Sequence, residues 1–253
     1  QWNFSQIGTS LYLSLPSPAA AGWYDRVRQE SPVQSMRRIQ KELAILGYAP
    51  SPKKLKPKKL AQQAEFYKWG RVSQIGDLAN PDDVTKWTVL LLGPSAAIAP
   101  DCPYFDGAVL KVKIILSPGY PFKCPAFSFV ADGDANIPFH PNVQPPSDPA
   151  AGQMCGDAIG IGAGGSAWKG TMDMFYVLGK IRDMLGDPDI TSALGGPAVT
   201  EAYLAAQSGG AAAVAMLTAQ VRSECALSFA ASAKQQFDAI KVPNLDASIA
   251  AAP

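Results

Sequence analysis

A chain of 253 residues with 47% hydrophobic and 17% charged residues can bury a substantial core, which excludes a chain that is disordered throughout. Its formal net charge of +1 gives no overall attraction to nucleic acid or to an anionic membrane, so any electrostatic preference must be local. The sequence contains no uninterrupted apolar stretch of about 18 residues, so we expect no ordinary transmembrane helix.

The four cysteines, Cys102, Cys124, Cys155 and Cys225, show no CxxC spacing. We expect unpaired thiols in a reduced compartment, with the cytoplasm as the default. The chain begins with Gln1 and not with Met, so targeting information could precede it and an organelle stays open as the location.

Residues 1–35 mix aromatic residues with Ser, Pro and Ala without a sustained period, and we interpret them as an N-terminal arm. Between residues 36 and 46, Ile39, Leu43 and Leu46 recur at helical spacing, which predicts an amphipathic helix. Gly47 is suited to end it.

A run of lysines between residues 53 and 59 is interrupted by proline, which opposes a continuous helix. We interpret it as a basic loop within an insertion at about residues 50–72, followed by a short helix at 62–69. The run is either a solvated linker or a docking site for a partner or a nucleic acid.

Three segments have strand character, namely 87–92, 109–116 and 126–130. In the second, apolar residues alternate with Lys111 and Lys113, which is the two-residue period of a half-buried antiparallel strand. Such short strands separated by turn residues predict an antiparallel meander.

Helical spacing returns between residues 174 and 185, with Thr171 as the expected N-cap and Asp187-Pro188 as the end. The Ala-rich stretch 199–237 predicts two more helices, broken near Gly209-Gly210. We therefore predict an α+β domain over about residues 36–240 and a C-terminal tail over 241–253.

Several motifs follow one another in a fixed order. They are RRIQKEL at 37–43, WTVLLLGP at 87–94, PYFDGAVLKVKIILSPGYPFKCP at 103–125, HPN at 140–142, GQMC at 152–155, and Trp168. Together they resemble the ubiquitin-conjugating enzyme family: its first helix, its first strand and turn, its second and third strands with a proline-rich loop, and its tripeptide, active-site cysteine and tryptophan. The resemblance implies an N-terminal helix, a four-stranded antiparallel meander, and central and C-terminal helices.

The resemblance also implies a chemistry. The Cys155 thiol would accept ubiquitin or a ubiquitin-like protein as a thioester, and a lysine amine would then displace it. Both steps pass through an oxyanion, and the match places the Asn142 amide near that charge. Ser192 stands where many members carry an Asp that orients the lysine, and Asp157 matches an acidic position beside the cysteine. We expect these four residues to form a catalytic site around an open thiol, without a metal or an organic cofactor.

The partners implied by the resemblance are ubiquitin or a ubiquitin-like protein, an activating enzyme and a ligase. Arg37 and Arg38 lie in the matched first helix, Phe122 matches an apolar ligase contact, and Trp168 is the matched tryptophan. No nucleic-acid partner is expected. His140, the only histidine, is interpreted as a structural residue, which argues against a Cys-His protease.

The chain departs from the family pattern on both sides of Cys155. The segments from Asn142 to Cys155 and from Cys155 to Trp168 are each about five residues longer than usual, and the first insertion could displace Asn142. The residues after Trp168 read KGT where the family commonly has SPA. These departures favour an alternative, a catalytically inactive domain that serves as a structural or adaptor subunit of a large assembly. The intact Cys155 and HPN tripeptide favour an enzyme.

Overall fold

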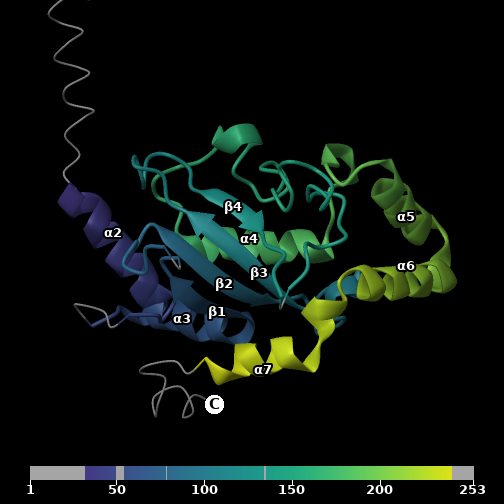
Figure 1. The fold of residues 1–253 in the computed structure, drawn as a ribbon, viewed down its shortest axis with the longest axis horizontal. Helices are drawn as coiled ribbons and strands as arrows, with labels where there is room; N and C mark the ends of the chain where they lie inside the picture. Colours follow the sequence, from purple (N-terminus) through teal and green to yellow (C-terminus); the bar gives the residue numbers. More distant parts are fainter. Residues whose placement is uncertain (1–31, 50–53, 78, 134, 241–253) are drawn as a thin grey trace, which may run out of the picture.

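The computed structural model describes residues 32–49, 54–77, 79–133 and 135–240. Within these ranges, a four-stranded antiparallel sheet is packed against six α-helices (Figure 1). The strands are β1 (Gly70–Ile75), β2 (Lys86–Leu92), β3 (Val109–Ile115) and β4 (Ala126–Phe129). The α-helices are α2 (Pro32–Ile45), α3 (Pro57–Trp69), α4 (Met174–Gly186), α5 (Pro197–Ser208), α6 (Gly210–Glu224) and α7 (Ala231–Ala239). The expected α+β arrangement is confirmed.

The sheet is a meander in which the strands lie in sequence order, β1-β2-β3-β4. Alternate residues of β2 and β3 point to one face, where the pairs Trp87–Ile114, Val89–Val112 and Leu91–Leu110 are completely buried. Helix α4 crosses behind this face (Figure 1) and adds its own buried apolar side chains to the same core. The two-residue period read in the sequence therefore sets the inner face of the sheet.

Helix α2 turns its apolar side toward the core through Ile39 and Leu43. It ends beside Gly47, whose φ of +70° favours glycine. A Cβ atom at Gly47 would lie 1.2 Å from the Tyr67 hydroxyl of α3, so the close approach of these two helices also requires glycine.

The first strand of the sheet was missed in the sequence. We matched 87–94 to the first strand, but that segment forms β2, because β1 occupies part of the segment that we had assigned to the insertion. The register of β1 is irregular between Val72 and Gln74, which breaks the two-residue pattern that would have revealed it. Helix α3 also begins earlier than expected, with Pro57 in its first turn, where proline is well tolerated.

The helices after the sheet correct two further expectations. The N-cap of α4 is Asp173 and not Thr171, because the Asp173 carboxylate accepts the Tyr176 N–H at 3.0 Å. The break at Gly209-Gly210 is confirmed, but three helices follow α4 where two were expected, since a 3-10 turn at Ala226–Phe229 separates α6 from α7.

Helix α7 packs on the outer face of the sheet. Its Ala233 and Phe237 form a second apolar cluster with Leu90 and Val109. The Arg71 guanidinium lies 4.4 Å from the centre of the Phe237 ring, which adds a cation–π contact.

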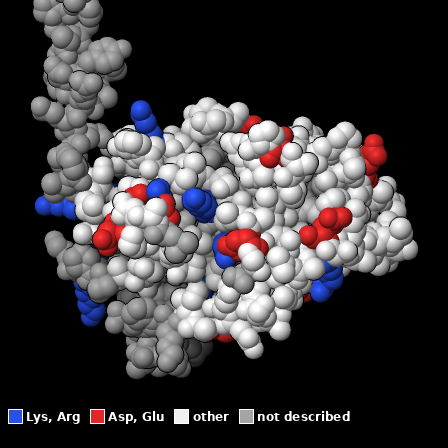
Figure 2. All heavy atoms as spheres, in the orientation of Figure 1, with Lys and Arg blue, Asp and Glu red and all other residues white. Residues whose placement is uncertain are grey.

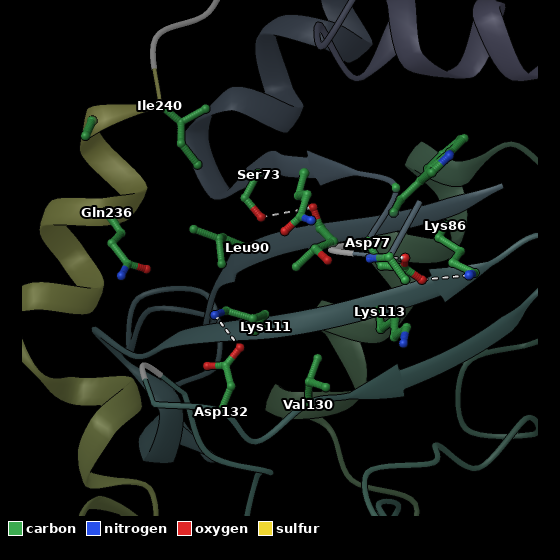
Figure 3. Close-up of a pocket in the computed structure, with 16 residues that line it drawn as sticks. Ser73, Asp77, Lys86, Leu90, Lys111, Lys113, Val130, Asp132, Gln236 and Ile240 are labelled. Atoms are coloured by element: carbon green, nitrogen blue, oxygen red, sulfur yellow. Dashed lines mark hydrogen bonds and ion pairs between the residues drawn. The ribbon is translucent and has the colours of Figure 1, made fainter. Parts of the chain in front are cut away.

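A hollow of about 750 Å³ remains on the outer face beside α7 (Figure 3). Its lining includes the ion pairs Lys86–Asp77 and Lys111–Asp132, each 2.6 Å long. None of the site residues predicted from the sequence lines it.

Within the described ranges, no helix combines the length and the apolar character that a bilayer crossing requires. Residues 1–31 of the predicted arm, residues 50–53 of the insertion and the tail at 241–253 lie outside those ranges. Residues 32–35, which we had assigned to the arm, form the start of α2.

Candidate active site

Cys155 lies directly beside the HPN tripeptide. Its backbone N–H donates to the Asn142 carbonyl at 2.9 Å, and a β-bridge joins the next pair outward, Val143 and Met154. The tripeptide and the cysteine segment therefore run side by side as a short antiparallel ladder.

The first insertion does not displace Asn142. Gln144 makes two further backbone bonds at 2.9 Å: its N–H donates to the Gln153 carbonyl, and its carbonyl accepts the Gly152 N–H. The extra residues 145–151 form a closed loop beyond this ladder, braced by the Asp148 carboxylate. The insertion therefore leaves the tripeptide in place.

The Asn142 side chain is completely buried, and both its nitrogen and its oxygen are hydrogen-bonded. Its Nδ2 donates to the carbonyls of Asp189 at 2.6 Å and Ser192 at 3.1 Å, and its Oδ1 accepts the Asp189 N–H at 2.8 Å. Both amide hydrogens thus hold the turn that follows α4. Three of the predicted site residues are brought together in this way: Cys155 and Ser192 each bond to Asn142 through their backbone.

Asp189 is a site residue that the sequence reasoning missed. Its carboxylate accepts the N–H and the hydroxyl of Thr191 at 2.9 and 2.6 Å, and it caps the 3-10 helix Ile190–Ser192. Hydrogen bonds from Thr191 first, and then from Ser192, lower the pKa of the Asp189 carboxyl. The signal was present in the Asp-x-Thr spacing after Asp187-Pro188, which is typical of an N-cap.

Asp157 is exposed and faces the glycine-rich loop that follows Cys155. Its carboxylate accepts the Ala163 N–H at 3.1 Å. The loop also closes on itself, because the N–H groups of Ile161 and Gly162 both donate to the Gly156 carbonyl. In the described conformation Asp157 therefore braces this loop.

Cys155 is only 8% exposed. The expectation of an open thiol is therefore wrong for this conformation. The chain turns back directly after the cysteine, where the Ile159 N–H donates to the Cys155 carbonyl at 3.3 Å. A hollow of about 490 Å³ lies alongside, lined by the adjacent Met154 and Gly156, with Cys124 on its wall.

His140, the first residue of the tripeptide, is buried. Its Nδ1 accepts the Asn142 backbone N–H at 3.1 Å, and its ring packs against Phe105 and Tyr203. Complete burial lowers the His140 pKa to about 3, so the ring is neutral at physiological pH.

Two of the predicted partner residues share one surface. Phe122 is 62% exposed, while Trp168 is half-buried and donates its indole N–H to the Pro121 carbonyl at 2.7 Å. Gly170 packs beside the Phe122 ring, since a Cβ there would lie 3.3 Å from Cδ1. The KGT segment after the tryptophan is thus folded against the proline-rich loop.

The two arginines of α2 differ sharply. Arg37 is exposed, as a partner contact requires, but Arg38 turns inward. Its guanidinium pairs with Glu42 at 2.5 Å and donates to the Met172 carbonyl at 2.7 Å. Most of the Arg38 side chain is therefore engaged inside the fold, with 20% of it exposed, whereas Arg37 is exposed.

Glu42 is the second residue that the sequence reasoning missed. It is 1% exposed and accepts the Met174 N–H at the start of α4 at 3.1 Å, in addition to Arg38. Burial raises the Glu42 pKa, and the charge of Arg38 opposes this rise. The sequence contained a signal for this burial, because Glu42 lies among Ile39, Leu43 and Leu46 on the apolar side of the amphipathic helix.

Among the described residues, no three His, Cys, Asp or Glu side chains are grouped so that they could hold a metal ion.

Comparison with known proteins agrees with this geometry. A family model described as ubiquitin-conjugating enzyme matches residues 32–207. The Candida albicans protein named ubiquitin-conjugating enzyme E2 2 is 32% identical over 112 residues, which cover 44% of this chain and 51% of the relative. The Saccharomyces cerevisiae ubiquitin-conjugating enzyme E2-24 kDa is 32% identical over 125 residues, covering 49% of this chain and 48% of the relative.

A viral relative, the ubiquitin-conjugating enzyme E2 of African swine fever virus, is 25% identical over 116 residues, which cover 45% of this chain and 46% of the relative. The chain spans about half the length of the curated relatives it matches. The family model matches well over half of the chain, from α2 into α5, and includes the tripeptide and Cys155. The chain belongs to the ubiquitin-conjugating enzyme family.

Proposed function

We propose that this chain accepts ubiquitin or a ubiquitin-like protein as a thioester on Cys155 and passes it to a lysine amine. The observation that carries the proposal is the 2.9 Å bond between the Cys155 N–H and the Asn142 carbonyl, which keeps the cysteine beside the tripeptide despite two lengthened loops. The partners of this function are an activating enzyme that delivers the modifier and a ligase that directs it.

The reaction consists of two acyl transfers. In the first, the modifier is bound to the activating enzyme as a thioester, and the Cys155 sulfur attacks its carbonyl carbon. The bond between that carbon and the sulfur of the activating enzyme breaks, and the Cys155 proton ends on the departing thiol. In the second, a lysine nitrogen attacks the new thioester and forms an amide. The amine loses a proton to solvent or to a nearby base, and the Cys155 thiol is regenerated.

Asn142 fits the part of oxyanion donor only if one of its bonds is released. The two Nδ2 hydrogens already bond to Asp189 and Ser192, and the bond to Ser192 is the longer at 3.1 Å. Loss of that bond would free one N–H for the oxyanion, while the bond to Asp189 would hold the side chain in position. We therefore assign Asn142 both tasks, holding the turn at rest and donating in the transition state.

We assign Ser192 the task of orienting the incoming lysine and not of deprotonating it, because a neutral hydroxyl is a weak base. The Asp189 carboxylate lies next to it and has a lowered pKa, so it stays ionised at neutral pH and attracts an ammonium group. Asp157 contributes through the glycine-rich loop that it braces.

The cover over Cys155 must open for either transfer. The glycine-rich loop is the segment suited to do this, since Gly162, Gly164 and Gly165 all have positive φ and Gly164 has no neighbour within 4 Å of a Cβ position. The modifier's C-terminal residues would then enter from the hollow beside Met154 and Gly156.

The inactive alternative rested on the lengthened loops and on the altered segment after Trp168. Both lengthened loops close on themselves through backbone hydrogen bonds, and the altered segment packs against Phe122. These observations weaken the grounds for the inactive alternative, while the burial of Cys155 requires the enzyme to uncover the thiol before it reacts.

The test is a gel assay with activating enzyme, ATP and ubiquitin. We expect an adduct that a reducing thiol removes, that disappears in Cys155→Ala, and that resists the thiol in Cys155→Ser because an oxygen ester replaces the thioester. Cys124→Ser is the matched control, since Cys124 is the more exposed thiol on the wall of the same hollow. An adduct that depends on Cys124, or no adduct with any ubiquitin-like protein, would falsify the proposal.

A further inference from the structure

A hollow of about 1030 Å³ lies where the last turns of α4 meet the loop after β2 and the helices α5 and α6. We call it the α4–α6 hollow. It shares no lining residue with the hollow beside Met154 or with the one on the outer face of the sheet. Its volume is large enough for several side chains, and no step of the reaction proposed above uses it.

Part of the wall of this hollow is apolar. It includes one residue of the loop and four of α5 and α6, namely Ile98, Ala206, Ala211, Val214 and Ala215. Ile98 is 64% exposed, and Met216, which follows the last of these residues, is 75% exposed. The two helices contain no charged residue between Glu201 and Arg222, and in Figure 2 white atoms predominate at the right margin, where Figure 1 places them. An exposed apolar surface of this kind is typical of a contact with another molecule.

The wall also carries two exposed carboxylates, those of Asp101 and Asp187. Both lie near the buried Cys102 thiol of the same wall, because burial first, and then the charges of Asp187 and Asp101, raise the pKa of that thiol. Neither carboxylate forms an ion pair with another residue of the part of the chain that the structure describes. The two charges are therefore available to an incoming cation.

The cations of the lining do not balance these charges. The lining has three carboxylates against two cations, and one cation, Lys180, already pairs with the third carboxylate, Asp183, at 3.3 Å. The other is Arg182, whose guanidinium donates to the Leu92 carbonyl at 3.1 Å and lies 5.6 Å from the centre of the Trp69 ring. The hollow thus joins an apolar surface to an excess of negative charge.

A wall of this composition is complementary to a cation on an apolar stem. The side chains of Lys and Arg carry their charge at the end of three or four methylene groups. Such a stem can pack against the alanines of α6 while the charged end reaches Asp101 and Asp187. A phosphate group or an acidic peptide would instead be repelled.

The hollow is joined to the candidate active site by a single turn. Asp187 and Pro188 line the hollow, and the next residue, Asp189, donates its backbone N–H to Asn142 Oδ1 at 2.8 Å. Two residues of extended chain span at most about 7 Å, so the hollow begins close to Ser192 and Asp189, to which we assigned the incoming lysine. The protein that delivers the lysine must therefore lie over this turn.

We propose that the α4–α6 hollow docks the acceptor protein by taking an Arg or Lys side chain that flanks the lysine to be modified. The inference rests on the proposed function and adds to it a class of acceptor, namely segments that carry a second basic residue within a few residues of the modified lysine, together with apolar residues. Docking of the flanking residue lowers the KM of the acceptor and leaves the chemistry at Cys155 unchanged.

The first test removes the charge of the hollow. The acidic-wall variant is Asp101→Asn/Asp187→Asn, which keeps the size of both side chains. The matched control is Asp82→Asn/Glu224→Gln, which removes the same charge from two exposed carboxylates that do not line the hollow. A second pair adds a like charge: Ala215→Lys lies in the wall, and its control Ala219→Lys lies one turn further along α6, exposed and outside the hollow.

The acceptors are two peptides with the same apolar residues, a blocked N-terminus and one lysine. In the first, arginines flank the lysine, and in the second, glutamines do. Discharge of ubiquitin-loaded Cys155 is measured against peptide concentration. For the unmodified chain we expect a KM about fivefold lower for the arginine peptide, with equal kcat. The acidic-wall variant and Ala215→Lys should abolish this difference, and both controls should keep it.

Three results overturn the inference. The first is an equal KM for the two peptides, or a difference that survives in the acidic-wall variant. The second is slower loading of Cys155 in that variant, which would assign the hollow to the activating enzyme. The third is slower discharge to free lysine, which would assign it to the bound modifier. A thioester still forms in each case, so the proposed function is unaffected.

A binding measurement decides the point even if no thioester forms. Fluorescence anisotropy compares the same two peptides, labelled, on the unloaded chain. Tighter binding of the arginine peptide, lost in the acidic-wall variant and kept in its control, supports the inference. Equal binding of the two peptides overturns it, whether or not the chain accepts ubiquitin.

Discussion

The surroundings of Cys155 and the junction of α2 with α4 are built on different physical principles. Around Cys155, backbone bonds join the tripeptide to the cysteine segment, and the Asn142 amide holds the turn after α4. Carboxylates take part there only by accepting hydrogen bonds within their own loops, and they form no ion pair with any described residue. At the junction, a buried ion pair between Arg38 and Glu42 supplies the connection. Substitutions in the two regions should therefore act differently, because a buried carboxylate left without its counter-ion lowers stability, whereas loss of the Asn142 bonds affects the reaction centre.

The largest expected effect comes from breaking the charged junction. Arg38→Ala leaves Glu42 buried without its counter-ion, and we expect the free energy of unfolding to fall by about 3–5 kcal/mol. Urea denaturation measures it. Lys68→Ala is the control, because it removes the exposed Lys68–Glu65 pair and should cost less than about 1 kcal/mol. Equal losses in the two variants would contradict the role of burial.

The second prediction concerns substitution of the Asn142 side-chain amide beside Cys155. Asn142→Ala removes the oxyanion donor and the bonds to Asp189 and Ser192, so we expect transfer to lysine to slow by about 10²- to 10³-fold. Single-turnover discharge of the loaded Cys155 measures it. Asn142→Asp keeps an acceptor for the Asp189 N–H but has no N–H to donate, and should be equally slow. Rapid discharge by the Asp variant would show that Asn142 acts only as an acceptor.

Gly152 tests how closely the cysteine segment approaches the sheet. A Cβ atom there would lie 2.0 Å from the Phe129 carbonyl oxygen, at a φ of +78°. We expect Gly152→Ala to lower the free energy of unfolding by about 2–3 kcal/mol. Gly164→Ala is the matched control, because Gly164 has φ +59° but no neighbour within 4 Å, and it should cost about 1 kcal/mol. Thermal unfolding that ranks the two in the opposite order would exclude a tight approach.

The protonation of His140 has no effect on stability near neutral pH, and its contribution shows only as the pH falls. Its folded pKa of about 3 lies below its unfolded value, so the unfolded chain binds the proton first. Stability is fully present above about pH 6.5 and falls as pH decreases, by about 1.4 kcal/mol per unit in the range down to the folded pKa. Comparing urea unfolding of the unmodified chain with His140→Gln isolates this slope, since the carboxyl groups contribute equally to both. If the free energy of unfolding fell with pH equally in both proteins, a group other than His140 would be responsible.

The elements with strong periodicity were predictable. The apolar spacing of α2 and α4 and the alternation in β3 gave the right type of element, with ends within a few residues. Strand β1 was not predictable in the same way, because its irregular register hides the alternation. Helix α7 was merged with its predecessor, since an Ala-rich sequence does not show where a turn falls.

The candidate site was predictable as residue types and not as contacts. The order of HPN, Cys155 and Trp168 indicated which residues to examine. That Asn142 reaches Asp189 and Ser192, or that Arg38 turns inward, depends on segments about 50 and 134 residues apart in sequence. Contacts between segments so far apart cannot be read from the spacing of motifs along the chain.

The family, the α+β class and the position of the candidate cysteine could be read from the sequence, because they follow from local periodicity and from motifs in order. The burial of Cys155, the three hydrogen bonds of the Asn142 side chain and the inward turn of Arg38 became known only from the folded chain. Burial and electrostatic environment arise from packing between distant segments, and they exist only once the chain has folded.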